Sequence, residues 1–171
     1  MDTRAPEAPN AGAERNVTAL YQEHAVSLAR LAMLMLGDAD AAQDVVQDAF
    51  FGLYRRWDKL ANADAAPAYL RTSVLNGCRT ALKKRSRPVL RAVAEPLESA
   101  EAALMHTEEQ RAMLTAIRRL PARQREALVL RYYLDMTEYQ AAQAMGVSRG
   151  TVKSATSRAI AAVGRMLREE P

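Results

Sequence analysis

The chain has 171 residues, with 24 Lys and Arg against 20 Asp and Glu, a formal net charge of +4 and a pI near 9.5. The lone Cys78 excludes a disulfide framework and a cysteine zinc site, and neither His24 nor His106 has metal-ligand spacing around it. No apolar run reaches the roughly 18 residues of a membrane span, and the N-terminus has no hydrophobic signal core, so we expect a cytoplasmic protein. Hydrophobic residues make up 49% of the sequence but aromatic residues only 5%. Because Ala and Leu are abundant, this composition predicts an all-α fold.

Composition divides the chain into four segments. Residues 1–15 contain two prolines and few large apolar groups, which predicts a disordered tail. Residues 16–86 and 107–168 carry helical patterns, and the proline-containing segment 87–106 between them predicts a flexible linker. We therefore expect two small helical domains, the second of them a four-helix domain with a helix-turn-helix.

Three helices are predicted in the first domain. The first runs from about Asn16 to Leu36 along an apolar stripe and ends at Gly37. The second runs from about Asp38 to Trp57, and the third from Pro67 to about Arg85, with the proline in a first turn that tolerates it.

The second predicted helix has an apolar face and an acidic face. Phe50 and Leu53 belong to the apolar face, which we expect to be buried. The opposite face carries an acidic stripe with one aromatic residue, formed by Asp40, Asp44, Gln47, Asp48 and Phe51. The pattern alone favours solvated acids near a helix N-terminus, and a docking face for a basic partner is the second interpretation.

The third predicted helix lies in a segment without acidic residues. From Ala65 to Ala94 there are seven cations and no Asp or Glu, which indicates an anionic partner, most simply nucleic acid. A membrane surface is the weaker interpretation, because the broad aromatic and leucine face is missing. Tyr69, Thr72, Asn76 and Arg79 add groups that suit unpaired bases.

The second domain is predicted to begin with helices from about Thr107 to Leu120 and from Ala122 to Leu134. Their expected inward residues include Met113, Leu114, Ile117, Leu120, Ala127, Leu128, Leu130, Tyr132 and Tyr133. A short helix then follows with Thr137 as N-cap and Gly146 as its stop, and Ser148 caps the next helix. Helix, glycine turn and helix form the geometry that places a recognition helix in a DNA major groove.

The last helix of this motif also has two faces. One face is apolar and is formed by Val152, Ala155, Ala159, Ile160, Val163 and Leu167. The other carries Lys153, Ser154, Ser157 and Arg158, and from Gly146 to Arg168 there is no acidic residue. Arg149 lies nearer the apolar face but could reach a phosphate from the first turn. The alternative is an ordinary helical hairpin with a solvated basic face.

Sequence patterns of catalysis are missing. There is no glycine-rich phosphate loop, nucleophile elbow, HExxH pattern or cluster of metal ligands. We therefore expect a protein that is not an enzyme and that needs no cofactor or metal.

Three stretches in this order resemble the extracytoplasmic-function sigma factors of bacterial RNA polymerase, group 4 of the sigma-70 family. Residues 40–57 look like the polymerase-binding helix of that family, and residues 68–76 with the following cations look like its promoter-melting helix. Residues 120–137, leading into Gly-Thr-Val-Lys-Ser at 150–154, look like its C-terminal domain that binds the −35 element. The resemblance covers about Thr18 to Leu167. Within the family, the chain is similar to the actinobacterial sigma-E-like subfamily.

The resemblance implies a function and a set of partners. The protein would bind core polymerase through the clamp helices of its largest subunit and the flap, direct it to promoters, and help to melt the −10 element. An anti-sigma factor is a possible further partner, and no membrane is implied.

The resemblance also implies roles for individual residues. It makes a docking face, and not solvated acids, the favoured interpretation of the acidic stripe. The polymerase-binding residues are Asp40, Asp44, Gln47, Asp48 and Phe51. The −10 residues are Tyr69, Arg71, Thr72, Asn76, Arg79 and Lys83, with Asn62 and Asp64 near a flipped base. The −35 residues are Arg149, Thr151, Lys153, Ser154, Ser157 and Arg158.

Two other functions stay open at the level of the residues. A stand-alone helix-turn-helix regulator would share the C-terminal motif without needing the acidic helix. A helical adaptor without a DNA role would leave the basic faces solvated.

Overall fold

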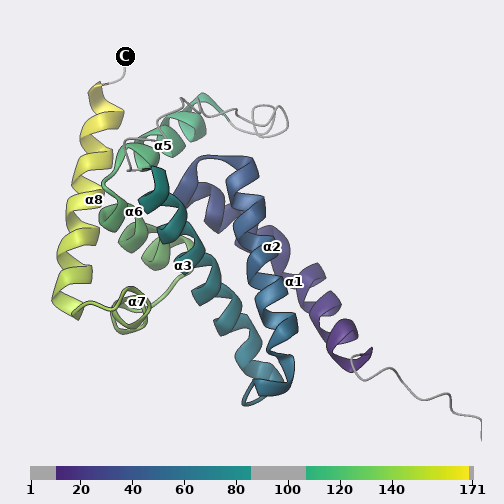
Figure 1. Ribbon diagram of the computed structural model, residues 1–171. Helices are drawn as coiled ribbons and strands as arrows, with labels where there is room; N and C mark the ends of the chain where they lie inside the picture. The colour runs from purple at the N-terminus through teal and green to yellow at the C-terminus, as the bar shows by residue number, and fades with distance from the viewer. Residues whose placement is uncertain (1–10, 86–106, 170–171) are drawn as a thin grey trace, which may run out of the picture.

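The computed structural model describes residues 11–85 and 107–169, and every regular element in these two ranges is helical (Figure 1). Residues 1–10 of the predicted tail and the whole of the predicted linker, residues 87–106, lie outside the described residues. The all-α prediction is confirmed, but the first helix, α1 (Ala11–Leu36), begins five residues earlier than expected. Ala13 in its first turn is buried and Glu14 suits the positive end of the helix dipole, so the helix extends through a segment predicted to be disordered.

The first unit, residues 11–85, consists of three long helices. After α1 come α2 (Ala39–Arg55) and α3 (Ala66–Arg85), with two short 3-10 turns, Trp57–Lys59 and Ala63–Ala65, between α2 and α3. The fully buried side chains of Leu31, Met35, Leu53, Leu70 and Leu75 meet where the three helices pack.

Glycine allows α2 and α3 to approach closely. A Cβ atom on Gly77 would lie 2.7 Å from Cγ1 of Val45, closer than non-bonded carbon atoms come. Gly77 is unusual inside a helix because of its low helix propensity, and the packing against Val45 explains its presence.

The second unit, residues 107–169, contains four α-helices and one π-helical turn. They are α5 (Glu108–Arg119), α6 (Ala122–Leu128), the π-helical turn η4 (Val129–Tyr133), α7 (Glu138–Met145) and α8 (Arg149–Glu169). The π turn leads into Asp135, whose φ of 50° is left-handed.

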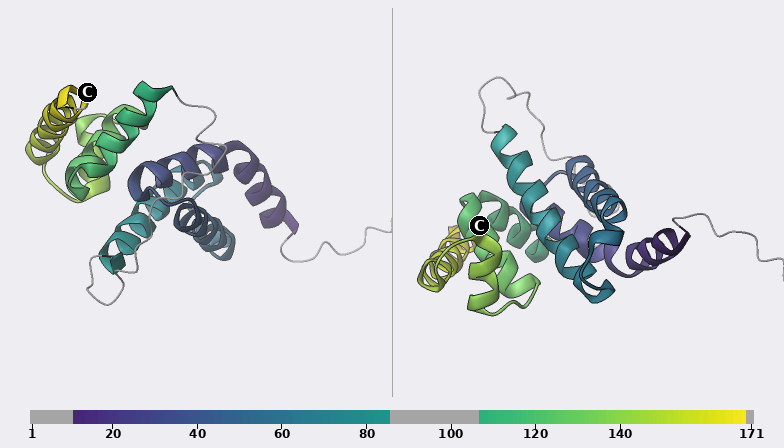
Figure 2. Two further views of the ribbon diagram at one scale, coloured as in Figure 1. Left: turned by 90° about the horizontal axis from the view of Figure 1, so that it is seen from above. Right: turned by 60° about the horizontal axis from the view of Figure 1, so that its bottom comes forward.

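The two units pack against each other. In both views of Figure 2 the second unit lies against the first, with α8 on the outer side of the molecule. One hydrophobic cluster contains buried residues of α1, α2 and α3 together with Val129, Leu130, Ala141 and Val152. The sequence predicted two domains, and the structure shows that they share part of one core.

Four residues expected to be buried are exposed instead. Met113, Tyr132, Tyr133 and Ile160 are 42%, 67%, 37% and 47% exposed. They line an apolar groove of about 640 Å³, together with Leu34 of α1. The apolar stripes predicted along α5, α8 and the segment that forms η4 are wider than the faces that the neighbouring helices cover, so the edge of each stripe stays open.

Candidate nucleic-acid interface

The outer face of α8 presents a basic and hydroxylated surface. The inward residues Val152, Ala155, Ala159 and Val163 are buried against α5, α6 and α7, which fixes the helix orientation. The exposed residues on the other side are Arg149, Lys153, Ser154, Ser157 and Arg158, and Thr151 is half-buried. The structure therefore gathers five of the six predicted −35 residues on accessible surface.

The turn before α8 is built by the predicted capping residues. Thr137 and Gln140 form a capping box at the start of α7, and Gly146 ends this helix with φ 64° and ψ 37°. Ser148 Oγ then accepts a hydrogen bond of 3.1 Å from the amide of Thr151 and lies 2.9 Å from its hydroxyl oxygen. These caps fix the angle between α7 and α8 and thereby aim the basic face.

The acidic stripe on α2 is also on accessible surface. Asp40, Asp44, Gln47 and Asp48 are exposed, and Phe51 is 63% exposed while its neighbour Phe50 is buried. The side chain of Asp38, just before the helix, accepts from the amide of Ala41 and pairs with Arg85 at 2.9 Å. Asp38 is thus occupied by helix capping, whereas the acids of the stripe face solvent.

The predicted −10 residues on α3 separate into two groups. Thr72, Asn76, Arg79 and Lys83 are spaced three or four residues apart and share one face of the helix. Arg71 is five residues from Asn76, about 140° around the helix, and does not join them.

Tyr69 is placed mainly for packing. It is half-buried against the core, and a Cβ atom on Gly52 of α2 would lie 2.9 Å from its hydroxyl oxygen. Its ring therefore fills the space between α3 and α2 instead of standing free to stack on a base.

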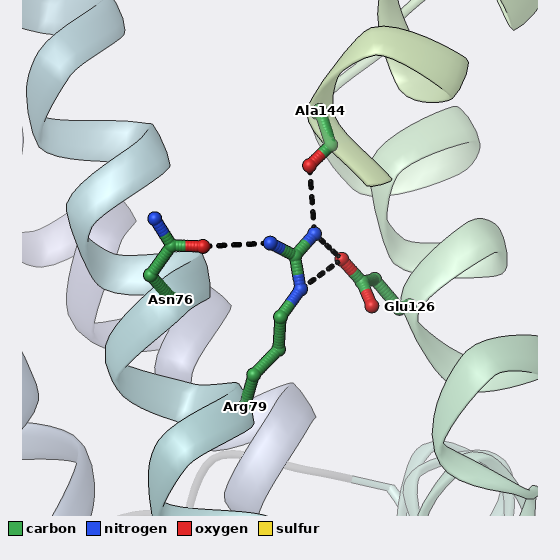
Figure 3. A network of polar contacts seen from close by, with 4 residues as sticks. All are labelled: Asn76, Arg79, Glu126 and Ala144. Carbon is green, nitrogen blue, oxygen red and sulfur yellow. Dashed lines mark hydrogen bonds and ion pairs between the residues drawn. The ribbon is translucent and has the colours of Figure 1, made fainter. Parts of the chain in front are cut away.

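Arg79 is the centre of a polar network that joins the two units (Figure 3). Its Nε donates to Glu126 Oε1 at 3.0 Å, and its Nη2 contacts the same oxygen. Nη2 also donates to the carbonyl oxygen of Ala144 at 2.7 Å, and Nη1 to Asn76 Oδ1 at 2.7 Å. We call Asn76, Arg79, Glu126 and Ala144 the Arg79 network.

Sequence reasoning missed Glu126, which is only 6% exposed. A signal was available, because Glu126 precedes the buried Leu130 by four residues and so lies on the inward side of its helix. A carboxylate at such a position needs a partner, but the sequence did not show which of the many cations supplies it.

Burial changes the acid–base properties of a neighbouring thiol. Cys78 is fully buried, and desolvation, followed by the charge of Glu126, raises the pKa of its thiol to about 12, while Arg79 acts in the opposite direction. The thiol is therefore protonated and inert at neutral pH, as expected for a small packing residue.

The loop before α3 borders a hollow in the surface. Asn62 Oδ1 accepts from the amide of Ala65 at 2.9 Å and thus holds the loop, while Asp64 is exposed. A hollow of about 420 Å³ lies beside Asp64, lined also by Trp57 and by His24 of α1.

The described residues show no gathering of His, Cys, Asp and Glu side chains that could hold a metal ion. None of the helices in the two described ranges is both long and apolar enough to cross a membrane.

Two family models match the chain: sigma-70 region 2 over residues 20–88 and sigma-70, region 4 over residues 110–163. The RNA polymerase sigma-E factor of Streptomyces avermitilis is 32% identical over 144 residues, which cover 84% of this chain and 78% of the relative. The ECF RNA polymerase sigma factor SigM of Mycobacterium tuberculosis is 32% identical over 155 residues, covering 86% and 75%.

Solved structures show the same arrangement of helices. The sigma factor RpoE from Bartonella quintana, in complex with the anti-sigma factor NepR, has a TM-score of 0.72 at 25% identity, covering 90% of this chain and 99% of that one. CnrH in complex with the cytosolic domain of CnrY has a TM-score of 0.67 at 25% identity, covering 95% and 96%. With region 2 in the first unit and region 4 in the second, the chain belongs to the extracytoplasmic-function sigma factors, non-enzymatic initiation factors that bind core RNA polymerase and promoter DNA.

Proposed function

We propose that three surfaces of this sigma factor divide the work of initiation, which takes place in the cytoplasm where the polymerase is. The acidic stripe of α2 docks on core polymerase, the outer face of α8 reads the −35 element, and α3 with the preceding loop holds the −10 strand. We further propose that the domains are residues 16–86 and 107–168, joined by the linker 87–106. Because the related RpoE was solved with an anti-sigma factor, we include such a protein among the partners to be tested.

The exposed basic face of α8 is the observation that supports this proposal most directly. Its inward face is buried, while the exposed cations Arg149, Lys153 and Arg158 alternate with hydroxyl groups. Lys and Arg neutralise phosphates and reach guanine edges, and Ser and Thr bond to either phosphates or bases.

The proposed −10 site combines cations with the hollow beside the loop. Lys83 is exposed at the end of the basic face of α3, where it can neutralise a phosphate. The hollow between Trp57, Asp64 and His24 offers an aromatic ring and hydrogen-bonding groups to an unstacked base. Base flipping costs a few kcal/mol, and stacking with phosphate contacts offsets this cost.

In-vitro transcription with core polymerase and fragmented genomic DNA tests the proposal. The protein should create new start sites, and Lys153→Ala should lower their use by about tenfold, because one phosphate or base contact of the −35 element is lost. Arg165→Ala is the matched control, since Arg165 is an exposed cation of the same helix that lies about 18 Å beyond Lys153 along the axis, past the last proposed −35 residue. Equal losses in both variants would refute the assignment of the reading face.

The same assay tests the docking surface when the polymerase concentration is varied. Asp48→Asn should raise the polymerase concentration needed for half-maximal transcription, because a charge of the acidic stripe is removed. Asp58→Asn removes another exposed acid outside the stripe and should leave this concentration unchanged. An effect of Asp58 as large as that of Asp48 would mean that net charge, and not the stripe, attracts the polymerase.

A further inference from the structure

We propose that the second unit competes with the −10 strand for Arg79, so that the free chain holds its guanidinium group against Glu126 and Ala144 until the two units separate. The inference rests on the proposed −10 role of α3. The proposed contact lies within this chain, and it restrains DNA binding before any other protein acts.

The guanidinium group of Arg79 has little capacity left for DNA. Of its five N–H groups, four are engaged: one with Asn76, one with the Ala144 carbonyl and two with Glu126. A phosphate or a base edge needs the same donors. Arg79 therefore binds either the second unit or DNA.

Both partners in the second unit gain from the contact. The carboxylate of Glu126 is buried, and a buried charge without a partner is strongly unfavourable. The Ala144 carbonyl lies in the last turn of α7, where helix carbonyl groups lack intrahelical donors and the dipole attracts cations. Arg79 thus satisfies two separate needs of the helix-turn-helix unit.

Further contacts hold the units in the same arrangement. Arg125 of α6 donates to the Met35 carbonyl at the end of α1, and the Tyr133 hydroxyl donates to the Ser27 carbonyl at 3.3 Å. The shared hydrophobic cluster lies beneath these polar contacts. The Arg79 network therefore belongs to a continuous interface and not to an isolated surface pair.

The interface engages one residue of the proposed −10 surface, Arg79, and leaves the other two functional surfaces open. The acids of the α2 stripe and the cations of α8 are exposed while the units are docked, whereas Arg79 is turned toward Glu126. Docking of the units therefore restrains the −10 contact of Arg79 and not the polymerase-binding or −35 contacts.

The distance between the units provides the first test, and it needs no DNA. Spin labels on Gln43→Cys of α2 and Ala161→Cys of α8 occupy exposed positions, and buried Cys78 stays unlabelled. Pulsed electron paramagnetic resonance of the full chain should give one narrow distance population. Glu126→Arg, which places two cations face to face, and Arg79→Glu, which places two acids there, should both shift and broaden this distance population.

The double variant with Arg79→Glu and Glu126→Arg distinguishes loss of the ion pair from misfolding of the single variants. It restores opposite charges, so the narrow distance population of the unmodified chain should return. A broad distribution in the unmodified chain, or no shift in either single variant, would overturn the proposal. A swap that stays open while circular dichroism shows native helix content would overturn it as well.

Binding of single-stranded DNA by the free protein provides the second test. Apparent affinity scales with the fraction of molecules that are open, so a variant that is open ten times as often should bind about ten times more tightly. We expect this gain for Glu126→Gln with a fluorescent 20-nucleotide DNA of mixed sequence. Glu109→Gln, an exposed acid of the same unit, loses the same charge and should bind like the unmodified protein.

The two tests also separate this inference from the proposed function. Unchanged DNA binding by Glu126→Gln would show that docking does not compete with DNA, even if transcription proceeds as proposed. A closed chain that opens in the variants but starts no transcription would instead contradict the sigma-factor roles and leave the contact between the units intact.

Discussion

At the scale of the residue, Cys78 gives the protein a pH dependence that can be measured. Its thiol pKa is about 12 in the folded chain and 9.0 in an unperturbed chain, so the folded-state value is raised. A raised pKa contributes stability that is fully present below pH 9 and is lost as the pH rises toward 12, because only the unfolded state releases the proton readily. Between these values the loss amounts to at most about 1.4 kcal/mol per pH unit.

Urea unfolding between pH 8 and about 11 checks this expectation. The unmodified protein should lose stability more steeply with rising pH than Cys78→Ala, which has no thiol to titrate. Parallel slopes would show that the Cys78 thiol is not desolvated in the folded state.

Some residue roles followed from the sequence and others did not. The exposure of Lys153, Asp48 and Phe51 followed from helical periodicity, because each lies opposite an apolar stripe. The pairing of Arg79 with Glu126 joins residues 47 positions apart. Periodicity describes one helix at a time, so it could not show which helix Arg79 faces.

At the scale of the element, the close packing of α2 on α3 makes Gly77 a sensitive position. Gly77→Ala would gain up to about 1 kcal/mol of helix propensity. The new Cβ would also lie 2.7 Å from the stiff, β-branched Val45, and such overpacking costs about 1–3 kcal/mol. We expect net destabilisation of up to about 2 kcal/mol in denaturant unfolding.

Gly164→Ala is the matched control within α8. A Cβ there would have Arg168 Nη1 as its nearest neighbour at 3.5 Å, an ordinary contact, so this variant should be more stable by up to about 1 kcal/mol. Adding Val45→Ala to Gly77→Ala should relieve the clash. If both alanine variants were equally stabilising, the close approach of α2 and α3 would be wrong.

The elements themselves were largely predictable from local chemistry. Thr137, Gly146 and Ser148 act at the helix ends where the sequence placed them, because capping depends only on neighbouring residues. The start of α1 was less visible, since the Ala- and Gly-containing segment before Asn16 has no clear cap. The exposure of Tyr132 and Ile160 depends on how far adjacent helices reach across a stripe, which no single helix reveals.

At the scale of the whole molecule, the shared core predicts cooperative unfolding. Val129, Leu130 and Val152 of the second unit pack in one cluster with the helices of the first. Arg125 adds hydrogen bonds to the ends of two helices, through the Met35 and Leu120 carbonyls. Calorimetry should therefore show a single transition whose van't Hoff and calorimetric enthalpies agree.

Arg125→Ala should weaken this coupling. It leaves helix-end carbonyls without donors, which costs about 1–3 kcal/mol, and should lower the transition temperature by several degrees. Two separate transitions in the unmodified protein would show that the units unfold independently and that the shared cluster contributes little.

The sequence predicted two helical domains in the right order because charge and periodicity change along the chain. It gave no sign that they share a core. Contacts between residues 31–79 and 126–152 carry no local pattern, since each apolar position would look the same if it packed only within its own unit.

The exposure of the acidic stripe on α2 has a kinetic consequence. Because the docked chain already presents these acids, capture by polymerase can proceed at a diffusion-controlled rate whether or not the units have separated. Engagement of the −10 strand must instead wait for a unimolecular opening step. The rate of promoter opening would then level off at high DNA concentration, and the Arg79 network would set the plateau.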